Sequence, residues 1–254
     1  MPKITSLIFY KIMRALSSLA LIGIVTFLIS SCGPTYYVPN SQNVPLFTEQ
    51  GQTHASARIS GGLYQTGFEL QGAHAVSDKR AVMLNMHAIS LENGGGGYFG
   101  EAGYGLYKSL GKHFVFETYG GLGYGSLNNL YYTEDGEREI KVNTDYLRLF
   151  AQPQIALTTK VVDFAFTSRF TYANFGQAPN IIGLPEYVQE ELQYIRDNQG
   201  NLFWEPGITL RLGWDYVKLE GQLLFSAPFT NNALNADPIN FNLGVTMKLP
   251  GKKK

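Results

Sequence analysis

The segment Val161–Tyr172 alternates apolar and polar residues over twelve positions. Apolar residues occupy its even positions with one break at Ser168, whereas Asp163 and Arg169 stand at odd positions. A period of two predicts a β-strand with one apolar and one polar face, because successive side chains of a strand point to opposite sides. Such a strand is long for a globular protein but suits a tilted membrane-spanning strand, which needs roughly 9–11 residues.

Most of the chain after Gln50 repeats this alternation. We therefore predict an all-β fold, namely an antiparallel up-and-down transmembrane β-barrel of about ten strands, with about eight strands as the alternative. The strand candidates are Thr53–Gly62, Thr66–Val76, Arg80–Leu91, Tyr98–Lys108, His113–Gly125, Thr144–Leu157, Val161–Ala173, Leu202–Gly213, Tyr216–Ser226 and Ile239–Leu249.

The connections between these candidates alternate in length. Tight turns are expected at Ser77–Lys79, Ser109–Lys112, Thr158–Lys160 and Trp214–Asp215. Longer loops are expected at Glu92–Gly97, Ser126–Asn143, Asn174–Asn201 and Ala227–Pro238, and only Leu63–Gln65 is short where a longer loop is expected. Outer-membrane barrels have short periplasmic turns and longer external loops. An even strand number therefore predicts that both termini of the mature chain are periplasmic.

One face of the candidates carries charged and amide side chains. A lipid-facing Arg or Lys costs roughly 2–4 kcal/mol at the membrane midplane, so we expect this face to line the lumen. Lys+Arg and Asp+Glu number 20 each, which allows luminal charges to pair and gives no argument for a nucleic acid partner. The predicted luminal residues are Arg58, Glu69, Asn85, Glu101, Glu117, Arg148, Asp163, Arg169, Glu205, Arg211, Lys218 and Glu220.

A soluble sandwich or a periplasmic lipocalin-like binding barrel, with the two faces inverted, is the alternative, because periodicity alone does not identify the outer face. Two features favour the membrane barrel. Charged residues make up only 16% of the chain, below the roughly 25–35% of a soluble surface. Aromatic residues also gather near predicted strand ends, as in membrane-interface belts: Tyr98, Tyr124, Tyr146, Tyr172, Trp204 and Trp214.

The N-terminus has the pattern of a targeting segment. Lys3, Lys11 and Arg14 precede the apolar run Ala15–Ile29, which is shorter than the roughly 20 residues that a membrane-spanning helix needs. We predict a lipoprotein signal peptide over residues 1–31. Residues 32–51, which are rich in proline and polar side chains, are expected to form an extended tether that leads to the rim of a barrel over residues 52–250.

The residues Leu28-Ile29-Ser30-Ser31-Cys32 resemble the lipobox of bacterial lipoprotein signal peptides. The resemblance implies cleavage before Cys32, with diacylglycerol on its thiol and an acyl chain such as palmitate on its new amine. Cys32 is the single cysteine of the chain, so no intramolecular disulfide is possible. An unmodified membrane anchor with a buried cysteine is the alternative.

Three short stretches carry a second resemblance, namely Cys32–Asn40, Asn43–Phe47 and Ala73–Lys79. They resemble uncharacterised outer-membrane β-barrel lipoproteins of Bacteroidota. This resemblance implies an outer-membrane location and a barrel fold, and no activity. The chain departs from the surface-exported lipoproteins of that group, because no acidic cluster follows Cys32.

The sequence offers few candidates for chemistry. The four histidines, His54, His74, His87 and His113, have no metal-ligand spacing. Outer-membrane lipid A deacylases use a His and a Ser two residues apart on one strand, together with a Glu. Here His87 and Ser90 are three apart, next to Glu92, and therefore point to opposite faces. We assign no catalytic, metal or cofactor site, and interpret His87 as a residue that lines the barrel.

Acidic residues of the luminal face leave one alternative open. Glu69, Glu101, Glu117 and Asp163 could include an acid/base pair, but a network of paired luminal charges explains them equally well.

The longest predicted loop, 174–201, contains one amphipathic segment, Leu184–Arg196, which we expect to form a helix that docks on the barrel mouth and restricts access. We predict a non-enzymatic structural or interaction role at the envelope. Outer-membrane lipid and an envelope protein at this loop are the expected partners. The alternatives are a membrane-embedded lipid or peptide hydrolase and a narrow solute pathway, although about ten strands argue against an open pore.

Overall fold

The structure is a computed structural model that describes residues 34–132, 139–176 and 185–251. The predicted signal peptide, Cys32 and Leu184 lie outside the described residues.

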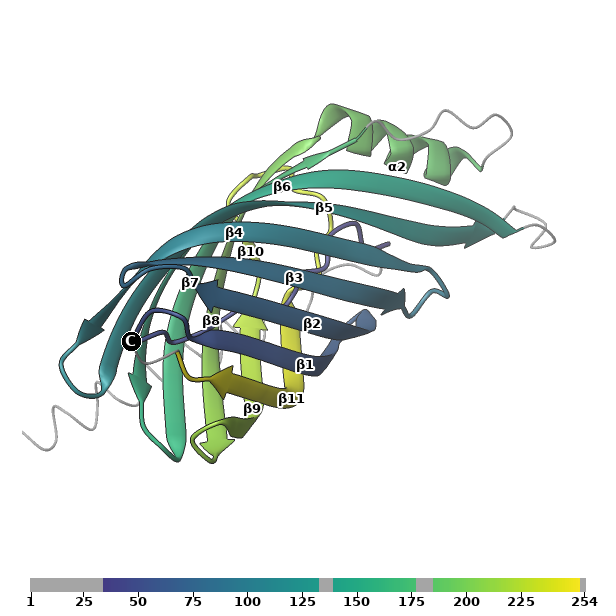
Figure 1. The fold of residues 1–254 in the computed structure, drawn as a ribbon. Helices are drawn as coiled ribbons and strands as arrows, with labels where there is room; N and C mark the ends of the chain where they lie inside the picture. Colours follow the sequence, from purple (N-terminus) through teal and green to yellow (C-terminus); the bar gives the residue numbers. More distant parts are fainter. Residues whose placement is uncertain (1–33, 133–138, 177–184, 252–254) are drawn as a thin grey trace, which may run out of the picture. The chain divides into compact units, whose positions relative to one another are not determined.

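Ten long strands form one antiparallel sheet that closes on itself (Figure 1). Neighbours in sequence pair from β1 to β9, and β11 then pairs with both β9 and β1 to complete the circle. The predicted all-β, ten-stranded antiparallel barrel is therefore confirmed. The strands are β1 Thr53–Gly62, β2 Gln65–Ala75, β3 Arg80–Leu91, β4 Gly96–Leu110, β5 Phe114–Tyr132, β6 Glu139–Thr158, β7 Val162–Phe175, β8 Gly200–Gly213, β9 Val217–Phe225 and β11 Ile239–Leu249; the two-residue β10, Ala227–Pro228, pairs with β8.

The connections divide the barrel into two ends. We call the end with the short connections after β2, β4, β6 and β8 the turn end, and the opposite end the loop end. β5 and β6 are longer than predicted and reach Tyr132 and Glu139, so most of the predicted loop 126–143 is a two-stranded extension. The physical reason is that inward-facing residues continue past the expected strand ends, and Leu127, Tyr131 and Val142 remain buried there.

The strand register places opposite charges side by side on the inner face. Arg169 of β7 lies opposite Glu205 of β8, and Arg211 lies opposite Glu220 of β9. Cross-strand pairs of opposite charge stabilise a sheet and favour one register over another. The alternation seen in the sequence therefore sets the face of each charged side chain, and the register places Arg169 and Arg211 opposite their acidic partners.

Every residue predicted to line the lumen is buried inside the barrel. Apolar side chains of the alternate positions face outward instead, for example Leu122, which is 63% exposed, and Phe166, which is 45% exposed. A soluble barrel would carry these faces the other way round, so this arrangement excludes the soluble alternative and is that of a membrane barrel. The prediction that Tyr146 belongs to an aromatic belt at the membrane interface was wrong. Its side chain is buried inside the barrel, because the alternation of β6 places it on the inner face.

The one helix of the described residues, α2, spans Glu186–Asp197, close to the predicted segment. Val188, Leu192 and Ile195 are buried, as its amphipathic pattern predicts, whereas Tyr187 is exposed. Within the ranges that the structure covers, no helix is long and apolar enough to cross a membrane.

The segment before β1 does not follow the predicted path. Residues 32–51 were expected to form an extended tether that leads to the barrel rim, but Thr35–Phe47 lie inside the barrel and every one of them is buried. We call Thr35–Phe47 the lumen segment. The expected position was wrong, because polar side chains of the barrel interior bind this segment.

Candidate functional site

The lumen segment runs from the loop end to the turn end. At the loop end, the amide of Tyr36 donates a hydrogen bond to the Asn235 carbonyl at 2.9 Å, and Asn129 of β5 donates to the Thr35 carbonyl at 3.0 Å. At the turn end, Phe47 packs among small and aromatic residues of β2, β3 and β4 next to the short turns. The described chain therefore begins, at Pro34, at the loop end and finishes, at Gly251, at the turn end. The prediction that both termini lie at the periplasmic end is wrong for the described chain, because the lumen segment crosses the barrel before β1 begins.

Two arginines bind the part of the lumen segment that is nearer the loop end. The carbonyl of Asn40 accepts a hydrogen bond from Arg169 at 2.8 Å, and its side-chain oxygen accepts one from Arg148 at 2.6 Å. Each arginine also pairs with a carboxylate, Arg148 with Glu101 and Arg169 with Glu205. All of these side chains are buried. Together they form a network in which two cations and two anions are paired around Asn40.

A tyrosine of the lumen segment joins the two ion pairs. The Tyr37 hydroxyl donates to Oε1 of Glu205 at 2.7 Å and accepts from Arg148 at 2.9 Å. Its ring stacks on Phe203, with the ring centroids 4.6 Å apart. A buried hydroxyl with both a donor and an acceptor partner is fully satisfied, so Tyr37 couples the segment to the wall by polar and apolar contact together.

The middle of the lumen segment is bound through its backbone. Glu69 accepts hydrogen bonds from the amide and hydroxyl of Ser41, and Arg58 donates to that hydroxyl at 2.6 Å. Gln222 accepts from the Gln42 amide at 2.7 Å and donates to the Gln42 carbonyl at 3.0 Å, as a neighbouring strand would. Inward-facing side chains thus make the hydrogen bonds with the backbone of the segment that a neighbouring strand would make in a sheet.

The part of the lumen segment nearer the turn end is bound by a carboxylate and an ammonium group. Glu117 accepts hydrogen bonds from the amides of Leu46 at 3.1 Å and of Phe47 at 2.8 Å. Lys248 donates to the Leu46 carbonyl at 2.5 Å. Leu46 adopts a left-handed backbone conformation, with φ of 59°, which costs about 1–3 kcal/mol for a non-glycine residue and persists only where surrounding contacts hold it.

An apolar cluster covers the loop end of the lumen. The buried face of α2 packs with Tyr36 of the lumen segment and with residues of the β5–β6 extension. The Tyr36 and Tyr131 hydroxyls lie 2.6 Å apart. Burial raises the pKa of the neighbouring Glu191 carboxyl in α2, and hydrogen bonds with Tyr36 and Tyr131 oppose that shift. The expectation that the helix docks on the barrel mouth is therefore confirmed, and its contacts include the lumen segment itself.

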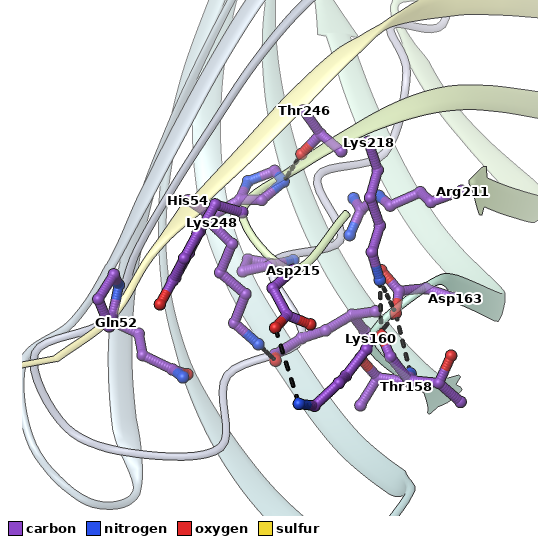
Figure 2. A pocket seen from close by; sticks show the side chains of 15 residues that line it. Gln52, His54, Thr158, Lys160, Asp163, Arg211, Asp215, Lys218, Thr246 and Lys248 are labelled. Carbon is purple, nitrogen blue, oxygen red and sulfur yellow. Dashed lines mark hydrogen bonds and ion pairs between the residues drawn. The ribbon is translucent and has the colours of Figure 1, made fainter. Parts of the chain in front are cut away.

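The turn end carries a cavity of about 250 Å³, which we call the basal pocket (Figure 2). Its cationic lining residues are Lys160, Arg211, Lys218 and Lys248, and its carboxylates are Asp163 and Asp215. Pro45 and Leu46 of the lumen segment form part of its wall. Lys218 pairs with Asp163 at 2.8 Å, and Lys160 lies 4.0 Å from Asp215.

The residues considered for catalysis do not come together. His87 is buried in the lumen, 3.0 Å from the Ser60 hydroxyl and 3.8 Å from Glu69, whereas Ser90 is exposed on the outer face, as their spacing predicts. Of the other histidines, His54 is buried beside Thr246, and His74 and His113 are exposed.

The four carboxylates considered as an acid/base pair belong to separate contacts. Glu101 and Asp163 pair with cations, and Glu69 and Glu117 bind amides of the lumen segment. In the described part of the chain, no group of three or more His, Cys, Asp or Glu side chains is placed to hold a metal ion.

The position of the lumen segment was not predicted from the sequence. One signal was present: Asn40-Ser41-Gln42-Asn43 offers amide and hydroxyl groups with no net charge, which suits burial among paired charges better than exposure on a tether.

No protein-family model matches the chain, and no curated protein matches its sequence. Among solved structures, the chain is similar to the N-terminal β-barrel domain of Pseudomonas aeruginosa OprF, with 8% identity and a TM-score of 0.37, covering 79% of this chain and 99% of that one. It is also similar to the β domain of the Bordetella autotransporter BrkA, with 10% identity and a TM-score of 0.42, covering the same shares of the two chains. These likenesses concern the barrel alone.

Proposed function

We propose that this protein is an outer-membrane lipoprotein whose barrel is closed by its own N-terminal segment, with a structural or binding role at the cell envelope rather than a role as a channel or an enzyme. The observation that carries the proposal is the burial of all residues from Thr35 to Phe47 inside the barrel. A barrel of about ten strands has little room beyond its own side chains, and here an extended segment occupies that room as well.

Conductance tests the closed barrel. Purified protein in a planar lipid bilayer should give no stepwise conductance, because the segment is bound along its length by buried side chains. Reproducible single-channel steps from the folded wild-type protein would overturn the proposal and favour a solute pathway.

The orientation follows from the connections. Because outer-membrane barrels carry their longer loops outside, α2 and the loop end would face the exterior, and the basal pocket would face the periplasm. Cysteines introduced at Gln193 in α2 and at Lys112 in a turn supply the test. A membrane-impermeant maleimide should label the Gln193→Cys variant on intact cells, and the Lys112→Cys variant only after the outer membrane is permeabilised. The reverse pattern would contradict the orientation.

The same orientation determines where a lipid anchor would insert. Cys32 precedes Pro34 by two residues in the sequence, and Pro34 lies at the loop end. A diacylglycerol on Cys32 would then enter the external leaflet, and the protein would be anchored at the cell surface. This proposal replaces the periplasmic anchor that the tether implied.

Lipidation and anchor position need separate measurements. Mass spectrometry of the mature N-terminal peptide should show an acylated Cys32, and the Cys32→Ser variant should remain an uncleaved precursor. For position, a non-lipoprotein signal peptide followed by a short epitope is joined directly to Pro34. An antibody should bind that epitope on intact cells. Binding only after permeabilisation would place the N-terminus in the periplasm and refute the surface anchor without affecting the lipidation result.

A further inference from the structure

The basal pocket carries more positive than negative charge. Four cationic side chains and two carboxylates line it, which leaves a formal excess of two positive charges. The carboxylate behind it, Glu220, does not cancel this excess, because it is shared between Arg211 at 2.5 Å and Arg58 at 2.5 Å. Glu117 does not line the pocket, and its carboxylate accepts hydrogen bonds from the amides of Leu46 and Phe47.

Two of the cations lack a full set of acceptors. Lys248 donates to the Leu46 carbonyl, and among the described residues no carboxylate lies within ion-pair distance of it. Nη2 of Arg211 is buried without a hydrogen-bond partner, and so is Nδ1 of His54. Arg211 is 3% exposed and His54 is 1% exposed. A buried guanidinium nitrogen without an acceptor is costly, so its presence beside a cavity points to an acceptor that belongs there.

The geometry of the pocket suits a small ligand. Figure 2 shows His54 and Lys248 on one side of the pocket and Arg211 and Lys218 on the other, with the Lys218 ammonium directed at Asp163 and the His54 ring at Thr246. Lys160, with a side chain that is 87% exposed, stands at the opening beside Asp215. A ligand that enters from the turn end would therefore meet Lys160 first and the buried cations afterwards.

We propose that the basal pocket is a binding site for a phosphate group, either free phosphate or the phosphate of a lipid headgroup. An anionic phosphate group, a dianion as free phosphate at neutral to alkaline pH and a monoanion in a headgroup phosphodiester, complements this excess of positive charge, and its oxygen atoms are acceptors for the arginine and lysine side chains that line the pocket. Arginine and lysine are the residues that proteins use to bind phosphate, through charge-assisted hydrogen bonds. This inference is independent of the lipid anchor on Cys32, and it goes beyond the structural role proposed above.

Titration of inorganic phosphate into the folded full-length protein, in a phosphate-free zwitterionic detergent, tests the site by calorimetry. We expect saturable binding at one site. The Lys248→Gln variant should bind about tenfold more weakly or worse, since a hydrogen bond to a charged group contributes about 1.5–3 kcal/mol, whereas Lys160→Gln should bind about twofold to fivefold more weakly, because solvent screens the charge of an exposed side chain. Lys112→Gln, at another turn and outside the pocket, is the matched control and should bind as the wild type does.

Lipid nanodiscs separate the two sources of phosphate. If the ligand is the phosphate of an anionic lipid headgroup, nanodiscs that contain phosphatidylglycerol should raise the melting temperature above that in pure phosphatidylcholine, whose headgroup has no net charge, and Lys160→Gln should reduce the difference. If the ligand is free phosphate, added phosphate should give that same stabilisation in phosphatidylcholine nanodiscs. Heat-modifiable migration on gels confirms folding of each variant, and Lys160→Gln, at an exposed position, decides the matter if Lys248→Gln fails to fold. The proposal is wrong if folded wild-type protein responds to neither source, or if both pocket variants respond as the wild type does.

Discussion

The Tyr37 hydroxyl donates a 2.7 Å hydrogen bond to Glu205, a residue 168 positions later in the chain. Tyr37 belongs to the segment inside the lumen and Glu205 to the wall, and both are buried. The same hydroxyl also accepts a hydrogen bond from Arg148. Tyr37 therefore links the segment to both ion pairs, Arg148 with Glu101 and Arg169 with Glu205. The interior of the barrel is therefore formed jointly by strand side chains and by chain that precedes the strands.

Removing the Tyr37 hydroxyl tests this joint interior. We expect Tyr37→Phe to lower the free energy of unfolding by about 1–3 kcal/mol, because Glu205 and Arg148 each lose a buried partner while the ring still packs. Urea unfolding in detergent, followed by tryptophan fluorescence, measures the loss. Tyr98→Phe, at an exposed position of the outer face, is the control and should change stability by less than about 0.5 kcal/mol. Equal stability of the two variants would show that the Tyr37 contact is not formed.

The polar side chains of the lumen segment should keep the barrel closed. Replacing Asn40, Ser41, Gln42 and Asn43 together by glycine retains the length of the segment but removes its side-chain contacts with Arg148, Glu69 and Asn85. Water should then enter to solvate the charges left without partners. In a planar bilayer, the variant should show frequent conductance steps that the wild type lacks. A silent bilayer with correctly folded variant protein would mean that the backbone alone closes the lumen.

The outer face is expected to tolerate apolar but not charged substitutions. Phe166→Arg should prevent membrane insertion, since a cation in contact with lipid near the midplane costs roughly 2–4 kcal/mol, whereas Phe166→Leu should insert normally. Heat-modifiable gel migration distinguishes folded from unfolded barrel.

Thr167, the neighbour of Phe166, is a different case. On the sequence alone, we expect arginine at this inward position to be mild. In the structure the Thr167 hydroxyl contacts Gln42 and the side chain is fully buried. An arginine there must displace the lumen segment, so Thr167→Arg should also destabilise the barrel, while Thr167→Ser should not. Wild-type stability of Thr167→Arg would argue against a filled lumen.

The docking of α2 should depend on pH through Glu191. Burial raises the pKa of this carboxyl above its usual value, so the docked helix binds the proton more tightly than the undocked one. Docking is therefore strongest below the ordinary pKa of a glutamate and weakens as the pH rises through the raised value. Hydrogen exchange of the α2 amides, corrected for intrinsic rates, should show greater protection at the acidic end. Glu191→Gln removes the titration and should give protection that does not change over this range.

Local alternation in the sequence determined the strands and divided their residues between two faces, while the low content of charged residues and the aromatic residues near strand ends favoured the membrane arrangement of those faces. Asp163 and Arg169 inward and Phe166 outward follow directly from a period of two, because a strand has only two faces and lipid excludes charge from one of them. The buried face of α2 followed in the same way from helical periodicity.

Only the tertiary structure decided where the residues before β1 lie. A segment without periodicity carries no sign of its partners, and the groups that bind it come from strands up to 202 positions away in sequence. The basal pocket is of the same kind, since Lys160, Arg211 and Lys248 meet only when β11 closes the sheet against β1 and β9. Contacts between distant residues depend on the closure and register of the whole barrel, which no single stretch of the chain contains.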